Sequence, residues 1–247
     1  MFDILILSSE KDFNKIKFVY ESINKNIENF NKINVISNVK IPDNIKISDI
    51  LYYTDDEVIN FDFSKFRSNV QKRKGWYVQQ YIKLFQNITL PEYLVVDSDI
   101  FFNRKIQIDE NKPVFFFGRD QYHLPYFEFM KRILNLDKIH NYSFINEIMY
   151  FKRSFIKKML DVLDVDDIEF FELSVNILNE MNEPAGISEY ELYGNFVTKY
   201  FPNFYDYKHI KTYLGGKHEQ WKDEEVLNYM KMFKDKDYDI VSMHTWI

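Results

Sequence analysis

Asp97 and Asp99 are the residues of this chain whose types and spacing say most about chemistry. They follow the apolar run Leu94–Val96 and are separated only by Ser98. Such a run is typical of a strand buried on both faces, and open parallel sheets place their ligand sites at the carboxyl ends of the strands. Side chains at i and i+2 of a strand point the same way. If strand geometry continues to Asp99, the two carboxylates can share one Mg²⁺ or Mn²⁺, which could also hold a diphosphate.

The same acidic pair has simpler explanations. An Asp-Ser-Asp sequence after a strand can be a solvated turn. The residues that follow, Ile100–Phe102, are apolar, which disfavours an exposed loop. An EF-hand calcium loop is excluded because its sixth position requires glycine, and this chain has Phe102 there.

Composition narrows the class of protein. The 247 residues are 46% hydrophobic and 28% charged, which suits a single α/β domain. The net charge of −6, with only the short basic run 72–74, argues against a nucleic-acid partner. The absence of cysteine excludes disulfides and thiolate chemistry. No stretch approaches the roughly 20 apolar residues of a membrane span, and the N-terminus is unlike a secretory signal. We expect a cytoplasmic protein, whether free, peripheral to a membrane or one module of a larger protein.

Hydrophobic periodicity predicts alternating strands and helices. The chain opens with a strand, a helix and a second strand, an order typical of a mostly parallel sheet flanked by helices. The predicted strands are 2–8, 33–39, 51–53, 94–97, 114–117, 148–151 and 239–246. The predicted helices are 10–30, one from 75 to about 85, 126–136, 153–163 and 170–181.

An apolar strand ending in Asp97-Ser98-Asp99 in the middle of an α/β chain, with His244 near the C-terminus, resembles the GT-A fold of nucleotide-sugar glycosyltransferases. The resemblance covers nearly the whole chain in its order of elements. It implies one GT-A (Rossmann-like) domain over 1–247, with a nucleotide-sugar-binding half at 1–102 and an acceptor-binding half at 103–247. It also implies that Asp97 and Asp99 bind Mn²⁺ or Mg²⁺ beside the donor diphosphate.

His244 matches the position of a late metal-binding histidine in many such enzymes, and neutral imidazole is a competent ligand for Mn²⁺. A packed histidine on a terminal strand is the other interpretation. His218 is the rival ligand, since it follows Gly215 and Gly216 and stands next to Lys217, which could approach a phosphate. A plain surface turn also explains that segment.

The helix that begins near Gly75 carries a polar stripe beside an apolar one. The stripe resembles a helix of some GT-A enzymes whose polar groups contact the donor or steady the metal carboxylates. An amphipathic helix with solvated amides is the alternative. The stripe consists of Trp76, Gln79 or Gln80, and Lys83.

Further donor contacts are placed by topology and by resemblance. Ser8, Ser9 and Asp55 end the early strands, where base and ribose contacts are expected, and Ser98 lies between the two acidic residues. Asn146 resembles an asparagine that binds the donor sugar in related enzymes, although Glu147 and Ile148 replace the small residue and glycine that usually follow it. Asp120, after strand 114–117, can bind a sugar hydroxyl or cap a turn.

Glu189 and Glu191 are the candidate catalytic residues. Ser188 is a helix N-cap and Glu191 stands at the capping-box position, which leaves Glu189 free. In inverting GT-A enzymes, a carboxylate at the start of a helix in this region removes the proton of the acceptor hydroxyl. Glu189 is therefore the first candidate and Glu191 the second, and a retaining enzyme would need neither.

The resulting prediction is a metal-dependent hexosyltransferase that moves a sugar from a nucleotide sugar, UDP-sugar as first choice, to a hydroxyl of a glycan or glycoconjugate, with inversion. One alternative is a phosphatase of the haloacid dehalogenase type, which also uses Asp-x-Asp. Such enzymes carry Thr or Val two residues after the second Asp, where this chain has Phe101. A carbohydrate-binding relative without catalytic activity is the non-enzyme alternative.

Overall fold

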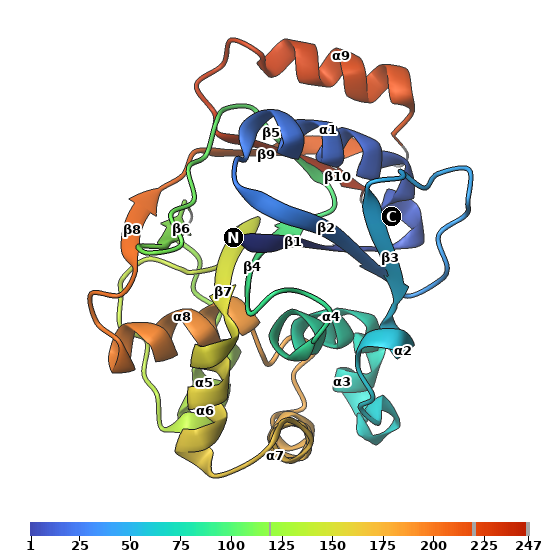
Figure 1. Cartoon of the computed structure of the whole chain (residues 1–247). Helices are drawn as coiled ribbons and strands as arrows, with labels where there is room; N and C mark the ends of the chain where they lie inside the picture. The colour runs from blue at the N-terminus through green and yellow to red at the C-terminus, as the bar shows by residue number, and fades with distance from the viewer. Residues whose placement is uncertain (119, 219–220, 246–247) are drawn as a thin grey trace.

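The computed structural model describes residues 1–118, 120–218 and 221–245. A central sheet of five strands lies in the middle of the molecule, in the order β3-β2-β1-β4-β7 (Figure 1). Its first four strands are parallel and β7 is antiparallel to β4. The predicted α/β class with a mostly parallel central sheet is therefore confirmed. The strands are β1 Phe2–Ser8, β2 Phe30–Ser37, β3 Ile50–Thr54, β4 Glu92–Asp97 and β7 Ile148–Lys152.

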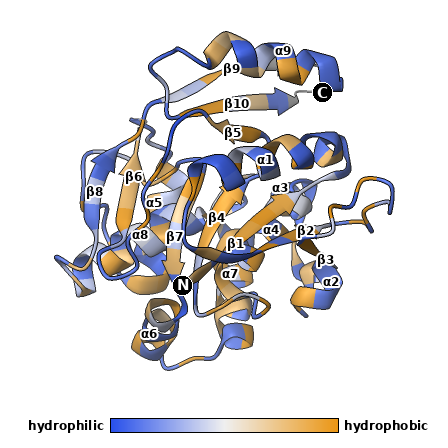
Figure 2. Cartoon of the chain, turned by 45° about the horizontal axis from the view of Figure 1, so that its top comes forward, coloured by the Kyte–Doolittle hydropathy of each residue, from blue (hydrophilic) through white to orange (hydrophobic). Residues whose placement is uncertain are grey.

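The two innermost strands are buried on both faces, as their apolar sequences require. Leu94, Val95 and Val96 of β4 are fully buried, and so are Ile4 and Ile6 of the neighbouring β1. Figure 2 shows these strands in the hydrophobic colour, whereas β8 at the periphery is hydrophilic. The core thus surrounds the strand that leads to the acidic pair.

Two smaller sheets were not expected from the sequence. β10 (Ile240–Thr245) pairs with β5 (Ile100–Phe102) and with β9 (Thr212–His218), and β6 (Val114–Phe117) pairs with β8 (Asp206–His209). The strand predicted at 114–117 and residues 240–245 of the one predicted at 239–246 therefore exist but lie outside the central sheet, and Trp246 lies outside the described residues. Strand partners far apart in sequence are set by the tertiary fold, which a local pattern does not encode.

Helices cover both faces of the central sheet (Figure 1). One face carries α1, the β5-β10-β9 sheet and, outermost, α9; the other carries α4 and α5 to α8. The helices are α1 Ile16–Asn26, α2 Asp55–Val58, α3 Ser68–Lys72, α4 Lys74–Phe85, α5 Leu124–Leu134, α6 Arg153–Leu163, α7 Asp167–Met181, α8 Glu189–Tyr200 and α9 Asp223–Phe233, with 3₁₀ helices η1 Glu10–Lys15 and η2 Phe63–Lys65.

The first predicted helix, 10–30, was too long. The segment begins with the 3₁₀ helix η1, and α1 ends at Asn26 because Ile27 is extended and Asn29 adopts a left-handed backbone with φ 64°. Phe30 already belongs to β2. None of the described helices is both long and apolar enough to cross a lipid bilayer.

Candidate active site

A small cleft lies at the carboxyl ends of β1 and β4, where ligands bind in sheets of this kind. Its volume is about 270 Å³, and polar atoms dominate its surface. Residues from β1, η1, α4 and the turn after β4 line it: Leu7, Ser9, Lys11, Asp12, Trp76, Gln79, Gln80, Lys83, Asp97, Ser98 and Asp99. The polar stripe of α4 and the acidic turn after β4 therefore line the same cleft.

The acidic pair does not continue the strand. β4 ends at Asp97, and Ser98 and Asp99 form a turn before β5. The i, i+2 argument for a shared cation required strand geometry up to Asp99, so that condition is not met. The two carboxylates instead face different walls of the cleft: Asp97 lies 3.7 Å from the Lys83 ammonium, and Asp99 Oδ2 lies 2.8 Å from His244 Nδ1.

His244 is brought to the acidic turn by β10. The Met243 amide donates to the Asp99 carbonyl at 2.6 Å, which ties the end of β10 to the turn after β4. The side chains of His244 and Asp99, which this bond brings together, are 145 positions apart in the sequence. Within the described part of the chain, no group of three or more His, Cys, Asp or Glu side chains is close enough to hold a metal ion. The side chains of Lys217 and His218, the rival candidates, lie outside the description.

Lys83 and Glu189 form a buried ion pair on the α4–α8 wall. Their Nζ and Oε1 atoms are 2.8 Å apart, and the side chains are 10% and 3% exposed. The Glu189 amide donates to Gln80 Oε1 at 3.4 Å, and the Lys83 ammonium lies 4.5 Å from the centre of the Tyr190 ring. The start of α8 is thereby attached to the polar stripe of α4.

The charges around the cleft shift the ionisation of its carboxylic acids. Desolvation raises the pKa of Asp97 to about 6, aided by Asp99 and Glu189 and opposed by Lys83, although 37% of the Asp97 side chain is reachable by solvent. Burial also acts to raise the pKa of Asp99, but the contacts with His244 and the nearby Lys15 and Lys11 outweigh it, so that this pKa is lowered. Asp99 is therefore the more readily ionised of the two.

Lys83 stays protonated in this setting. Burial favours the neutral amine, but the nearby Glu189, Tyr190 and Asp97 outweigh it, and the pKa of Lys83 lies well above its ordinary value. Lys83 lines the cleft, where the Asp97 carboxylate lies 3.7 Å from its ammonium.

Sequence reasoning missed the second lysine that supports the cleft. Lys15 is fully buried; it donates to Asp12 Oδ1 at 2.7 Å and to the Met243 carbonyl at 2.6 Å. Asp12 also accepts from the Ser9 hydroxyl at 2.9 Å. The available signal was the Asp12/Lys15 spacing of three directly after the first strand, which resembles an ordinary solvated pair. Lys11, which lines the cleft from the same turn, was missed for the same reason.

Other predicted site residues lie away from this cleft. Ser8 is buried, and its hydroxyl donates to the Ser9 carbonyl. Asp55 starts α2 and lines a different cavity, and desolvation raises its pKa to about 6. Asp120 is exposed. Asn146 is buried; its Oδ1 accepts from the Glu147 amide at 2.7 Å, and its Nδ2 has no partner in the described structure.

Glu191 is bound to the loop before β7 and not to the cleft. Its carboxylate accepts from the Ser143 hydroxyl at 2.6 Å, from the Phe144 amide and from Asn195 Nδ2. Burial raises its pKa against these hydrogen bonds. Ser188 caps α8 as predicted, because its hydroxyl accepts from the Glu191 amide at 3.3 Å. The Glu191 side chain, however, stabilises the loop at 143–144 and does not complete a capping box.

Comparisons with known proteins place the chain in a family. Residues 2–242 match DUF6492, described as a family of unknown function. No curated protein matches the chain. A solved structure of an active-site mutant of LgtC aligns with a TM-score of 0.48 at 10% identity, covering 97% of this chain and 86% of that one. A TM-score below 0.5 provides no correspondence between individual residues. The match over nearly the whole length shows that this chain belongs to DUF6492.

Proposed function

We propose that the protein is a metal-dependent glycosyltransferase that moves a sugar from a nucleotide diphosphate donor to a hydroxyl of a glycan or glycoconjugate. The observation that carries the proposal is the cleft at the carboxyl ends of β1 and β4, where Asp97, Asp99, Lys11 and Lys83 line one small volume. A diphosphate needs concentrated positive charge, and lysines combined with a carboxylate-bound cation supply it in an otherwise acidic protein.

Asp97, Asp99 and His244 are the residues that would hold Mn²⁺ or Mg²⁺. Two carboxylates and an imidazole suit such a cation chemically, but Asp97 lies beside Lys83 and Asp99 is bonded to His244, so the three side chains would have to converge before one cation could bind. A bound cation would neutralise the diphosphate and stabilise it as leaving group. The Met243–Asp99 backbone hydrogen bond keeps the imidazole and the acidic turn together.

Lys83 is positioned to hold the departing diphosphate. Its ammonium lies between the Asp97 and Glu189 carboxylates, and Lys83 lines the cleft in which the diphosphate would bind. Lys11 lines the same cleft from η1. Positive charge from both walls would oppose the negative charge that develops as the sugar leaves.

Glu189 is the proposed general base of an inverting reaction. Its carboxylate would accept the proton of the acceptor hydroxyl while that oxygen forms the new bond to the anomeric carbon and the bond to the diphosphate oxygen breaks. The salt bridge to Lys83 and the N-terminal position on α8 fix where the Glu189 side chain lies. Glu191 is bound to Ser143 and is not assigned this role.

The test is turnover of a panel of nucleotide sugars, UDP-sugars first, with Mn²⁺ and a mixture of glycan acceptors. We expect release of nucleoside diphosphate and formation of a glycoside. Asp99→Asn should remove the Mn²⁺-dependent thermal shift caused by the nucleotide, and Glu189→Gln should keep that shift but lose turnover. Asp137→Asn and Glu180→Gln are matched controls at exposed positions.

Three results would count against the proposal. Hydrolysis of small phosphoesters without turnover of any nucleotide sugar would favour the phosphatase alternative. Carbohydrate binding without turnover would favour the non-catalytic relative. Full turnover in Glu189→Gln would remove that residue from the base role.

A further inference from the structure

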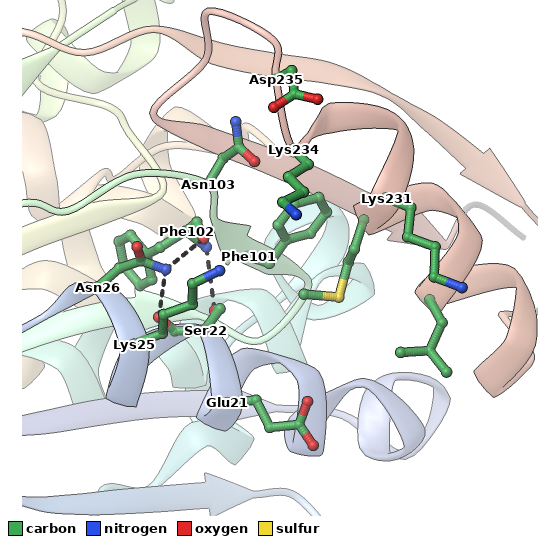
Figure 3. Close-up of a pocket in the computed structure, with 12 residues that line it drawn as sticks. Glu21, Ser22, Lys25, Asn26, Phe101, Phe102, Asn103, Lys231, Lys234 and Asp235 are labelled. Atoms are coloured by element: carbon green, nitrogen blue, oxygen red, sulfur yellow. Dashed lines mark hydrogen bonds between the residues drawn. The ribbon is translucent and has the colours of Figure 1, made fainter.

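A larger cavity, about 550 Å³, lies between α1, β5 and α9 and shares no residue with the cleft (Figure 3). This size is in the range of small-molecule sites, roughly 300–1,000 Å³. Most of the surface that lines it is apolar. The proposed glycosyltransferase chemistry assigns it no role.

The floor of this cavity has its polar backbone groups already paired. The Phe102 amide donates to the Ser22 hydroxyl at 3.2 Å, and the Phe102 carbonyl accepts from Asn26 Nδ2 at 2.8 Å; both bonds are drawn in Figure 3. Phe101 belongs to the same floor, and Met230 and Leu227 of α9 form the facing side. Leu227 is 45% exposed. What the floor and α9 offer a ligand is therefore mainly apolar contact.

Three lysines stand around the apolar surface: Lys25, Lys231 and Lys234. All are exposed, and none forms an ion pair within the described structure, whereas lysines elsewhere on the surface, such as Lys65 and Lys131, do. Each lies near the C-terminal end of its helix, where a cation is favoured, but that preference does not require them to meet at one cavity.

The acidic residues of the same rim stand apart from this basic side. In Figure 3, Lys25 and Lys234 extend toward the middle of the cavity, over the phenylalanine floor, while Glu21 and Asp235 lie at opposite ends. Three lysines against two acidic residues leave a net charge of +1 on the lining. In a chain of net charge −6, this combination of positive rim and apolar interior is a local exception.

We propose that this cavity binds one molecule of an anionic amphiphile. The apolar tail would lie against Phe101, Met230 and Leu227, and a carboxylate or phosphate head group would bind Lys25 and Lys234. Lysine stems can cover the tail while their ammonium groups remain in water beside the head group. A purely apolar ligand would leave the ammonium groups unpaired, and a small inorganic anion would leave the apolar surface exposed.

Two elements of the cavity follow directly on segments that line the cleft. β5 starts directly after Asp99, and α1 continues from η1, whose Lys15 binds the Met243 carbonyl. The proposal does not depend on the glycosyltransferase assignment, because its test measures binding alone.

The experiment titrates the full chain by calorimetry with dodecyl phosphate, kept below its micelle concentration. We expect saturable binding of one molecule per chain, and binding at least about tenfold weaker for dodecanol and for inorganic phosphate, because each offers only one of the two contacts. Lys25→Ala/Lys234→Ala should weaken dodecyl phosphate binding by about tenfold or more. Lys40→Ala/Lys208→Ala, which changes two exposed lysines outside the cavity, is the matched control and should bind as the parent protein does.

Leu227→Asp provides a second variant, because it places a negative charge at the apolar side and should also weaken binding. Circular dichroism would verify that each variant is folded. Equal affinity of the parent and the Lys25/Lys234 variant would overturn the proposal, as would equal binding of dodecyltrimethylammonium, which would indicate non-specific adsorption of amphiphiles.

Sedimentation with phosphatidylglycerol vesicles separates two sources of the ligand. Vesicle binding that is lost in Lys25→Ala/Lys234→Ala would identify a membrane lipid as the source. Binding of monomeric dodecyl phosphate without vesicle binding would identify a free amphiphile. Absence of both would contradict the site.

Discussion

Two buried lysine–carboxylate pairs flank the cleft, one on each wall. Lys15 pairs with Asp12 in the turn after β1, and Lys83 pairs with Glu189 between α4 and α8. The N–O distances, 2.7 and 2.8 Å, are nearly the same. The chemistry of the two pairs is alike, so any difference in their roles must come from what else each lysine contacts.

Those further contacts differ in kind. Lys15 donates to the backbone carbonyl of Met243, next to His244, and is fully enclosed. Lys83 has as its further neighbours a ring face of Tyr190 and the carboxylate of Asp97, which is 37% exposed to the cleft. We infer that the first pair holds β10 in place, whereas the second presents charge to a ligand.

Lys15→Met should cause the largest loss of stability. It leaves Asp12 without its cation and the Met243 carbonyl without its donor, a combination expected to lower the free energy of unfolding by about 3–5 kcal/mol. Urea unfolding monitored by circular dichroism measures this. Asp12→Asn in the same background should recover part of the loss. A smaller loss than in Lys83→Met would reverse the inferred division between the pairs.

Lys83→Met should cost less stability and more ligand affinity. Water can reach one of its two carboxylate partners, Asp97, through the cleft, so we expect a loss of about 2–3 kcal/mol in unfolding free energy, with a coupling of about 1–2 kcal/mol to Glu189→Gln in a double-mutant cycle. The thermal shift caused by a nucleotide diphosphate with Mn²⁺ should disappear, because the ammonium no longer meets the phosphate. Retention of that shift would show that Lys83 is only structural.

Asp55 is a partly buried carboxylate without such a lysine in the described part of the chain, so its pKa shows the effect of burial more clearly. It forms no ion pair within the described residues, and desolvation, with the charge of Asp56, raises its pKa from 3.8 to about 6. The folded state therefore holds the proton more tightly than the unfolded state. This contribution to stability is fully present below pH 3.8 and is lost as the pH rises through 6.

An asparagine does not titrate, so Asp55→Asn does not lose this contribution. The unfolding free energy of the variant should therefore increase relative to that of the parent between about pH 4 and 6.5. After allowance for solvent screening, we expect the variant to be more stable by about 1–2 kcal/mol at the upper end of that range. Thermal unfolding of both proteins across that pH range measures it. A pH-independent difference would show that Asp55 is not desolvated in the folded chain.

The smallest effect on stability is expected for a lysine–carboxylate pair that is exposed to solvent. Glu28 and Lys105 are 2.7 Å apart, but their side chains are 67% and 70% exposed. Water already solvates both charges, so Lys105→Ala should leave the unfolding curve unchanged within error. A clear destabilisation would mean that burial is not the reason why the two pairs at the cleft contribute more to stability than this exposed pair.

Local sequence patterns predicted where helices and strands lie far better than which strands pair with one another. The helix at 153–163 was predicted with its observed bounds, and the strand ending at Asp97 was found, because hydrophobic periodicity and burial are local properties. A shared cation was predicted on the condition that strand geometry continues through Ser98 and Asp99, which form a turn. The strand does not continue, because β5 leaves the central sheet to pair with β10, a strand some 140 residues later in the chain.

The sequence by itself determined the class of fold and the gathering of chemistry at one sheet edge: an apolar strand followed by two acidic residues, and a helix with a polar stripe. Only the tertiary structure decided which carboxylate meets which partner. Asp97 faces Lys83, which pairs with Glu189, whereas Asp99 faces His244, and Lys15 joins the site from a segment whose sequence resembled plain surface. Side-chain types and their spacing can be read from the sequence. Burial and long-range pairing, which shift the pKa of each ionisable group, arise only when distant segments pack together.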